Sequence, residues 1–221
     1  MASLIDLHTH TSHSSPCGHM TAEELIEAAI EAGLDGVAVT EHLVIGGAKV
    51  AQEIGRQKYG YPVFCGVEAK ATIFGDVLVF GCPRDFEPSI PWGVLRRIVS
   101  ESGGVLIPAH PFRRWDRHSF WNYLEDQGLS LNGRLEKMDF VQGLTAIEVC
   151  NGGCKAEENA EAADLARILA LPGVGGSDAH VVTRVGCAAT WFPGEIATDA
   201  ELVGALKRGG YRAVDRRRRR Q

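Results

Sequence analysis

The sequence predicts an α/β protein built on a mostly parallel sheet. Short apolar runs typical of strands alternate with helical patterns over most of the 221 residues, as they do in chains of strand–helix units. About seven such units can be distinguished, which indicates a barrel, open or closed, with a doubly wound sheet as the alternative. A hydrophobic content of 45% is enough for one sizeable core, so we expect a single domain.

The first half of the chain carries clear helix and turn signals. Thr21-Ala-Glu-Glu24 is a capping box, followed by apolar residues at helical spacing and closed by Gly33. Residues 72–74 and 77–80, split by Gly75-Asp76, are expected to pair as a hairpin. The other elements expected here are strands over 4–10, 36–40 and 62–67 and a helix over 47–59.

The second half continues the alternation. Thr198-Asp-Ala-Glu201 is another capping box, and it opens a last helix that ends near Gly209. The polar and aromatic stretch 113–140 is expected to hold one or two helices, with Trp115, Phe120, Trp121 and Tyr123 in a local core. The other elements expected here are helices over 92–100 and 155–169 and strands over 105–107, 146–149, 174–176 and 188–192.

Charge is distributed unevenly along the chain. The formal net charge is −5, and because Arg216–Arg220 is a run of five arginines, the remaining chain carries −10. An acidic body argues against a general nucleic-acid-binding surface, and only weak binding through the arginine run is expected. We expect the domain to cover residues 1–211 and residues 212–221 to form a basic, disordered tail.

The sequence indicates a cytoplasmic protein. It has no apolar run of transmembrane length, and its start lacks the basic and apolar segments of a signal peptide. The six cysteines include no CxxC pair, so they are expected to be reduced thiols, mostly small core residues.

Histidine and acidic residues gather at the ends of the expected strands. His8 and His10 lie two residues apart after the first strand, so their side chains share a face. Strand ends of parallel barrels converge on one side, and imidazoles with carboxylates there are typical of a site for two or three metal ions with a bridging carboxylate. The other residues in this position are Glu41, His42, Glu68, His110, Asp178 and His180.

Several short motifs contain or follow these residues. They are Asp6-Leu-His-Thr-His10, Gly36-Val-Ala-Val-Thr-Glu-His42, Gly66-Val-Glu68, Ala109-His-Pro111, Glu148-Val-Cys-Asn151 and Gly176-Ser-Asp-Ala-His180, with Val185-Gly and Thr190-Trp-Phe192 after them. Together they resemble the PHP (polymerase and histidinol phosphatase) family of metal-dependent phosphoesterases. The resemblance implies a distorted (β/α)7 TIM-like barrel with two or three divalent metal ions, Zn, Mn or Fe.

The resemblance also implies where the metals bind. One site would use His8, His10, Glu68 and Asp178, and a second would share Glu68 with His110. A third would use His42, His180 and a ligand from the first loop, for which His19 is the best match and Cys17 and His13 are the alternatives. The chain departs from the family pattern with Glu41 in place of an aspartate, and without a histidine in the run 76–81, where Asp76 is the only substitute.

The function expected from this resemblance is hydrolysis of a small phosphate ester, a nucleotide or a phosphorylated metabolite, by metal-activated water. Arg113, Arg114 and Arg184 are candidates for binding the phosphate, since the guanidinium matches phosphate oxygens. Asp178 or His180 would protonate the leaving group. The alternatives are a metal-dependent hydrolase of a non-phosphate bond, similar to an amidohydrolase, and a metal-binding module without catalysis. The sequence leaves the substrate and the oligomeric state open.

Overall fold

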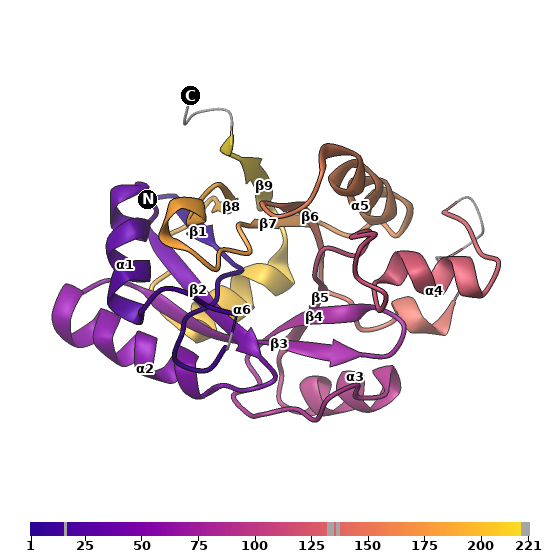
Figure 1. Ribbon diagram of the computed structural model, residues 1–221, viewed down its shortest axis with the longest axis horizontal. Helices are drawn as coiled ribbons and strands as arrows, with labels where there is room; N and C mark the ends of the chain where they lie inside the picture. Colours follow the sequence, from indigo (N-terminus) through magenta and orange to yellow (C-terminus); the bar gives the residue numbers. More distant parts are fainter. Residues whose placement is uncertain (16, 132–134, 136–137, 218–221) are drawn as a thin grey trace.

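The strands of the computed structural model form two sheets (Figure 1). Residues 1–15, 17–131, 135 and 138–217 are described. The larger sheet has the order β5-β4-β3-β2-β1-β8-β9, and the smaller pairs β6 with β7. The strands are β1 (Ser3–Asp6), β2 (Gly36–His42), β3 (Val63–Ala71), β4 (Gly75–Phe80), β5 (Val105–Pro108), β6 (Ile147–Asn151), β7 (Gly173–Gly176), β8 (Ala188–Phe192) and β9 (Arg212–Asp215).

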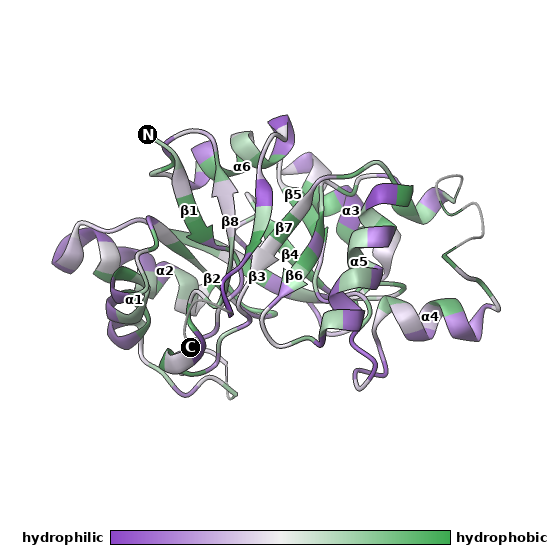
Figure 2. Ribbon diagram, turned by 90° about the horizontal axis from the view of Figure 1, so that it is seen from above, coloured by the Kyte–Doolittle hydropathy of each residue, from purple (hydrophilic) through white to green (hydrophobic). Residues whose placement is uncertain are grey.

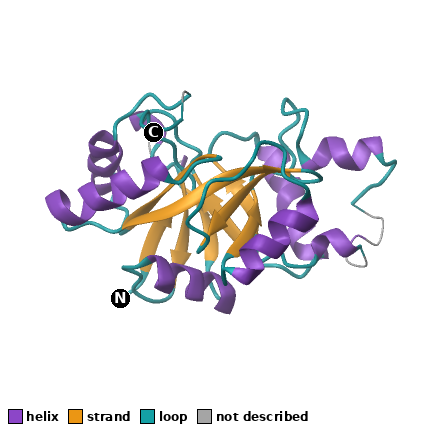
Figure 3. Ribbon diagram, turned by 90° about the horizontal axis from the view of Figure 1, so that it is seen from below, coloured by secondary structure: helices purple, strands orange, loops and turns teal. Residues whose placement is uncertain are grey.

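In the described residues, α-helices lie around the curled sheet (Figure 3), and α6 (Asp199–Arg208) packs into its concave side. The capping boxes at Thr21 and Thr198 open helices as predicted, because each threonine side chain accepts a hydrogen bond from the backbone N–H three residues on. The helices are α1 (Ala22–Glu31), α2 (Gly46–Ile54), α3 (Trp92–Glu101), α4 (Phe120–Asp126), α5 (Ala156–Ile168) and α6 (Asp199–Arg208), with short turns η1 (Gly55–Tyr59), η3 (Asp139–Val141) and η4 (Val182–Arg184).

Strand directions depart from strict parallel alternation. Strands β1, β2 and β3 are parallel, whereas β4 runs antiparallel to β3 and β5, and β8 runs antiparallel to β1 and β9. The ends of β1 and β7 are joined by backbone bonds from His10 N to Ala179 O (3.0 Å) and from Asp178 N to His8 O (2.8 Å). The predicted mixed α/β domain is therefore confirmed as a curled, half-barrel sheet, while the strand ladder of the described residues does not form one continuous barrel.

Side-chain alternation along the strands divides the interior into two parts. Val63, Cys65 and Val67 on β3 face the helices, where they join the larger apolar cluster. Figure 2 shows hydrophobic stretches along the strands of the sheet. Phe64 points to the opposite, concave face and packs with apolar residues of the second cluster, which also contains the α6 side chains. Farther along the same face β3 carries Glu68. The concave face is therefore apolar at first and carries charged side chains toward the carboxyl end of the strand.

The hairpin lies elsewhere than predicted. Residues 72–74 form the turn rather than a strand, and β3 itself pairs with β4, with Lys70 opposite Asp76. The turn is possible because Ile73 and Gly75 adopt positive φ angles of 81° and 72°. As a result, Glu68 lies in the middle of a strand rather than after its end, as the sequence had suggested.

The C-terminal segment continues the sheet. Residues Arg212–Asp215, which fall in the expected basic tail, form β9 and pair with β8. The Arg216 guanidinium donates to the carbonyl oxygens of Gly186 (3.2 Å) and Ala32 (2.7 Å). Residues 218–221 lie outside the described residues, so the disorder expected there stays a prediction. Among the residues that the structure describes, no helix has the length and apolar character needed to span a membrane.

Candidate metal centre

Glu68 is the carboxylate on which the predicted ligands converge. It is only 1% exposed on the concave face of β3. Its Oε1 lies 3.2 Å from His8 Nε2 and 3.0 Å from His110 Nε2, and its Oε2 lies 3.3 Å from His10 Nε2 and 2.9 Å from His42 Nδ1. These imidazoles arrive from the ends of β1, β2 and β5. One carboxylate therefore faces four imidazoles from three other strands.

Asp178 approaches the same point from the end of β7. Its Oδ1 lies 3.5 Å from Nε2 of both His8 and His10 and 3.7 Å from His180 Nδ1. Asp178 and His110 adopt positive φ angles of 54° and 30°, a backbone conformation that is uncommon outside glycine and clusters at functional sites. We call His8, His10, Glu68 and Asp178 the inner cluster.

Glu148 on β6 orients the inner cluster from behind. Its Oε1 lies 3.0 Å from His8 Nδ1, and its Oε2 accepts hydrogen bonds from His110 N (2.8 Å) and Asn151 Nδ2 (2.9 Å). A carboxylate can only accept, so Nδ1 of His8 carries the proton and Nε2 presents a lone pair to Glu68 and Asp178. This is the usual outer-shell arrangement behind a metal-binding histidine. The sequence suggested Glu148 only as a family match.

The inner cluster leaves buried polar atoms without partners. His8 Nε2, both ring nitrogens of His10 and Glu68 Oε2 are buried and make no hydrogen bond. Acceptor atoms brought together in a dry site are costly unless a cation lies among them. Nitrogen and oxygen donors of this kind are the ligands of divalent metals such as zinc. The residues therefore fit divalent metal ions.

Among the described residues, four groups of possible ligands have their donor atoms within 4.8 Å of one another. Seven of the eight predicted ligands occur in them, and Asp76 joins them. The groups are His8–His10–Glu68, His8–His110–Asp178, His10–His42–His180 and Glu68–Asp76–His110.

The pKa values of the inner cluster show the same preference for positive charge. Burial lowers the pKa of His8, but the carboxylates of Asp178, Glu148 and Glu68 outweigh it and raise that pKa well above its ordinary value. Burial would raise the pKa of Glu68, yet its imidazole neighbours, His8 first, hold it well below its usual range. The cluster is thus an anionic pocket that stabilises cations.

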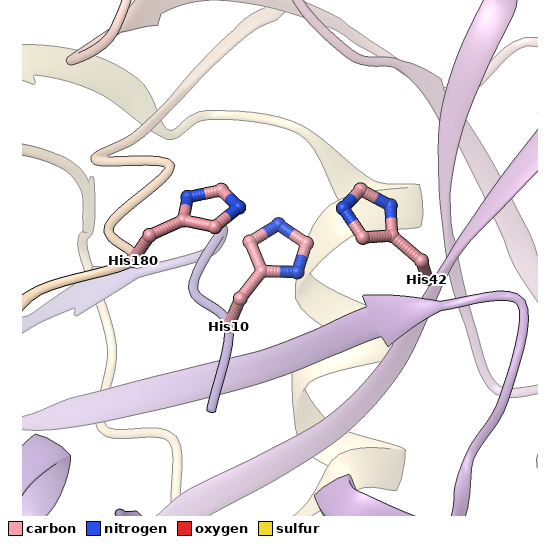
Figure 4. Close-up of side chains that lie close together, drawn as sticks. All are labelled: His10, His42 and His180. Carbon is pink, nitrogen blue, oxygen red and sulfur yellow. The ribbon is translucent and has the colours of Figure 1, made fainter. Parts of the chain in front are cut away.

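A second set of imidazoles lies nearer the surface. The rings of His42 and His180 stack on either side of His10, with centroids 4.5 Å and 4.4 Å from it (Figure 4). Their side chains are 39% and 30% exposed. His180 Nδ1 lies 3.1 Å from the backbone oxygen of Asp178, which can only accept, so Nε2 is the free ring nitrogen. We call His42 and His180 the rim pair.

The predicted loop ligand is not brought to the rim pair. His19 is exposed and occurs in none of the four ligand groups found among the described residues, and its backbone N–H donates to the oxygen of His180 at 2.8 Å. The alternatives Cys17 and His13 are exposed as well, and neither occurs in the ligand groups of the described residues. Of the three loop candidates, Cys17 is the one that lines the cavity, together with His42 and His180.

Glu41 shapes this loop instead of orienting a histidine. Its side chain is fully buried and accepts hydrogen bonds from the backbone N–H of Thr11 at 3.1 Å and from the hydroxyls of Thr11 and Ser15. Ser15 Oγ in turn lies 3.4 Å from the backbone N of His42. The second-strand carboxylate therefore anchors the loop against β2.

Arg113 is the only candidate arginine that lines the cavity in the described part of the chain. Its guanidinium is 7% exposed, bonds Asp178 Oδ2 and lies 2.9 Å from Asn151 Oδ1, while its buried Nε has no partner. Trp115, expected in a local core, is instead 74% exposed, with the Arg113 guanidinium 5.0 Å from its ring.

The other two candidate arginines point elsewhere. Arg114 pairs with Glu161 on α5 at 2.7 Å and lies over the ring of Trp121. Arg184 donates to the carbonyl oxygen of Gly152. Neither lines the cavity.

The cavity over the inner cluster has a volume of about 280 Å³. Sequence reasoning missed two of its charged residues, Lys70 and Asp116. The two-residue spacing from Glu68 on a single strand face could have indicated Lys70. Its lining residues are Cys17, His42, Glu68, Lys70, Asp76, His110, Arg113, Trp115, Asp116, Asp178 and His180.

Family comparison matches nearly the whole chain. The PHP domain model matches residues 6–166, and the PHP-associated model matches residues 156–211. Comparison with curated proteins gave no match.

Solved structures share this fold. PsfC from Pseudomonas syringae PB-5123 is 20% identical, with a TM-score of 0.70 over 97% of this chain and 91% of that chain. A two-domain protein from Bacteroides vulgatus ATCC 8482, containing a predicted PHP-like metal-dependent phosphoesterase, is 17% identical, with a TM-score of 0.67 over 97% and 65%. An amidohydrolase from Chromobacterium violaceum with bound sulfate and no metal is 17% identical, with a TM-score of 0.57 over 80% and 87%. Likeness at such identities shows the fold alone.

Proposed function

The chain belongs to the PHP domain family, and from that premise we propose that it is a metal-dependent phosphoesterase acting on a small phosphate ester. The observation that carries the proposal is the convergence of His8, His10, Glu68 and Asp178 with an unpaired Arg113 Nε beside them. Metal ligands next to a buried guanidinium suit a phosphoryl group, which needs both charge neutralisation and a planar donor. The small cavity favours a nucleotide or a phosphorylated metabolite over a long nucleic acid.

The ligand groups define three candidate metal positions, which we call corners. We assign one metal to the inner cluster, one to His42 and His180 with Cys17 in reach, and a third corner to Glu68 and His110 with Asp76. Imidazole and carboxylate donors suit Zn, Mn or Fe. The chemistry that divalent cations supply in such a site is the activation of water as a nucleophile and the neutralisation of charge on a phosphoryl oxygen.

The chain's own residues bind and orient the substrate. Arg113 lines the cavity and would present its guanidinium to a phosphoryl oxygen, while Asp178 and Asn151 hold Nη2. His180, whose Nε2 is free and partly exposed, is placed to give a proton to the leaving oxygen. Glu148 keeps the His8 ring in the orientation that turns Nε2 to the substrate side.

A second reading is hydrolysis of a non-phosphate bond. It is favoured by the amidohydrolase among the similar folds. If the Arg113 guanidinium improves turnover of phosphate esters but not of other substrates, this alternative is contradicted. We also retain as proposals a cytoplasmic location, and a distorted (β/α)7 barrel as the finer description of the half-barrel, supported by the backbone bonds between the ends of β1 and β7.

Phosphate release from a panel of phosphate esters, by protein loaded with Mn²⁺, tests the proposal. Asp178→Ala should lose bound metal and turnover together, whereas the exposed Asp164→Ala should keep both. Arg113→Met should lower kcat/KM for phosphate esters by roughly a hundredfold or more, since a charge-assisted contact to the phosphoryl group is lost. Its neighbour Arg114→Met, which loses contacts to Glu161 and Trp121 away from the cavity, should stay near wild type. Metal-loaded wild type that releases no phosphate from any ester would contradict the proposal.

A further inference from the structure

Lys70 lies inside the third corner of the metal centre. It is two residues beyond Glu68 on β3, so both side chains project onto the concave face. On the neighbouring strand β4, Asp76 is its direct partner in the ladder, and Lys70 Nζ lies 2.8 Å from Asp76 Oδ1. The Lys70 side chain is 37% exposed and that of Asp76 is 10% exposed. The ammonium therefore reaches from the cavity wall to a nearly buried carboxylate.

That carboxylate is also one of the possible metal ligands. Asp76 forms a ligand group with Glu68 and His110, with donor atoms within 4.8 Å of one another. An ammonium 2.8 Å from one of these donors and a divalent ion bound to the same group repel each other. Because the group is largely buried, water screens this repulsion poorly. The two cations compete for the corner.

The other two corners are arranged differently in the described part of the cavity lining. At the inner cluster Arg113 also bonds a ligand carboxylate, but it takes Oδ2 of Asp178 and leaves Oδ1 to the histidines, and His8, His10 and Glu68 remain as further ligands. In the rim pair, His42 lies against Glu68 and His180 against Asp178, and both rings stack on His10. At the Lys70 corner the ammonium takes one oxygen of Asp76, and only Glu68 and His110 remain beside it to bind an ion.

We propose that the Lys70 ammonium takes the place of a divalent cation at the Glu68–Asp76–His110 corner, so that this protein binds one metal ion fewer than its ligand groups allow. The inference rests on the proposed function of the site. The ammonium neutralises Asp76 and lines the cavity, which gives an anionic substrate a cationic contact in addition to Arg113. It also explains why the run 76–81 contains no histidine: with a lysine in this corner, a further neutral ligand has no ion to bind.

Metal stoichiometry tests the inference without relying on activity. Wild type, Lys70→Met, Lys70→Arg and the exposed control Lys49→Met are loaded with excess Mn²⁺, dialysed, and measured for bound metal by mass spectrometry and for stepwise affinity by titration calorimetry. Lys70→Met should hold one further equivalent, or bind its weakest ion about tenfold or more tightly, because the repulsion is removed. Lys70→Arg and Lys49→Met should match wild type.

A double variant locates the additional ion. Lys70→Met/Asp76→Asn should return to the wild-type number, since the carboxylate that would bind the ion is gone, and thermal denaturation checks that each variant is folded. A Lys70→Met protein with wild-type stoichiometry and affinities overturns the inference, and so does a double variant that keeps the additional ion. Wild type that holds no Mn²⁺ contradicts the proposed function itself, which separates the two failures.

Discussion

The inner cluster and the rim pair use the same residue types but are held very differently. The inner side chains are at most 6% exposed; Glu148 orients His8, and Arg113 and Asn151 contact Asp178. The rim histidines are 39% and 30% exposed and stack on His10. Burial strengthens electrostatic interactions and fixes ring orientation, so the inner cluster should bind metal tightly. The rim pair should bind a more readily exchanged ion.

The largest effect is expected at the residue that serves both regions. Glu68→Gln keeps the size of the side chain but removes the charge that faces four imidazoles. We expect loss of bound metal from both regions and a fall in kcat/KM of roughly a thousandfold or more, as an amide oxygen is a much weaker ligand. Metal analysis and steady-state kinetics provide the measurement, with the exposed Glu53→Gln as control. Unchanged metal content would remove Glu68 from the centre.

The next effect concerns Asp6, whose buried carboxyl group accepts hydrogen bonds from backbone groups next to the inner cluster. Asp6 is fully buried and accepts hydrogen bonds from the backbone N–H groups of His8 (3.2 Å), Ser177 (2.8 Å) and Gly186 (2.9 Å). Burial raises its pKa from 3.8 to about 6. The folded state therefore binds the proton more tightly than the unfolded chain. This contribution to stability is fully present below about pH 4 and is lost as the pH rises through about 6, amounting to about 3 kcal/mol.

The measurement is urea unfolding of wild type and Asp6→Asn between pH 4 and 7, with chelator present throughout so that metal binding does not contribute. The difference in unfolding free energy, wild type minus variant, should fall as the pH rises. The variant retains every other titrating group. If this free-energy difference stays constant or rises with pH, the Asp6 carboxyl group is hydrated rather than dry.

Outer-shell support should matter more for the inner cluster than for the rim pair. Glu148→Gln can no longer fix the Nδ1 proton of His8 as a carboxylate does. We expect metal affinity at the inner cluster to fall about 10- to 100-fold. Titration with Mn²⁺ should show this loss in the tightest step and leave the weaker, rim step unchanged. An equal loss in both steps would mean that the two regions are not supported separately.

The smallest effect is expected in the first loop. Cys17 and His19 are both exposed, but Cys17 lines the cavity and His19 does not. Cys17→Ala should weaken the rim ion by less than about tenfold and abolish a thiolate charge-transfer band in Co²⁺-loaded protein, since thiolate is a good but dispensable ligand here. His19→Ala should leave both unchanged. The opposite result would restore His19 as the loop ligand.

Many ligands of the candidate metal centre could be predicted because apolar patterns in the sequence indicate where strands end and which side chains share a face. His8, His10, His110 and Asp178 come directly after apolar runs, and parallel strands bring the residues at their carboxyl ends to one side of a sheet. Glu148 behind His8 could not be assigned this role, because its contact depends on how β6 approaches β1 across the curled sheet. The hairpin prediction was wrong because glycine is typical of turns, so Gly75 was expected in the turn. In the structure Gly75 is the first residue of β4.

Neighbouring arginines show the limit of such reasoning most directly. Arg113 and Arg114 are identical in type and adjacent in the chain, yet one bonds Asp178 and the other Glu161 on α5. A turn after β5 directs the two side chains to opposite sides, and its backbone angles depend on packing around His110. Composition and spacing contain no information on that choice.

The sequence by itself determined the family, the mixed α/β class and most of the candidate ligands, since these depend on local periodicity and on short motifs in order. Only the tertiary structure decided that Glu68 faces four imidazoles, that Arg113 rather than Arg184 lines the cavity, and that Lys70 pairs with Asp76. Those facts depend on strand register and backbone direction, which are set when segments far apart in the chain pack together.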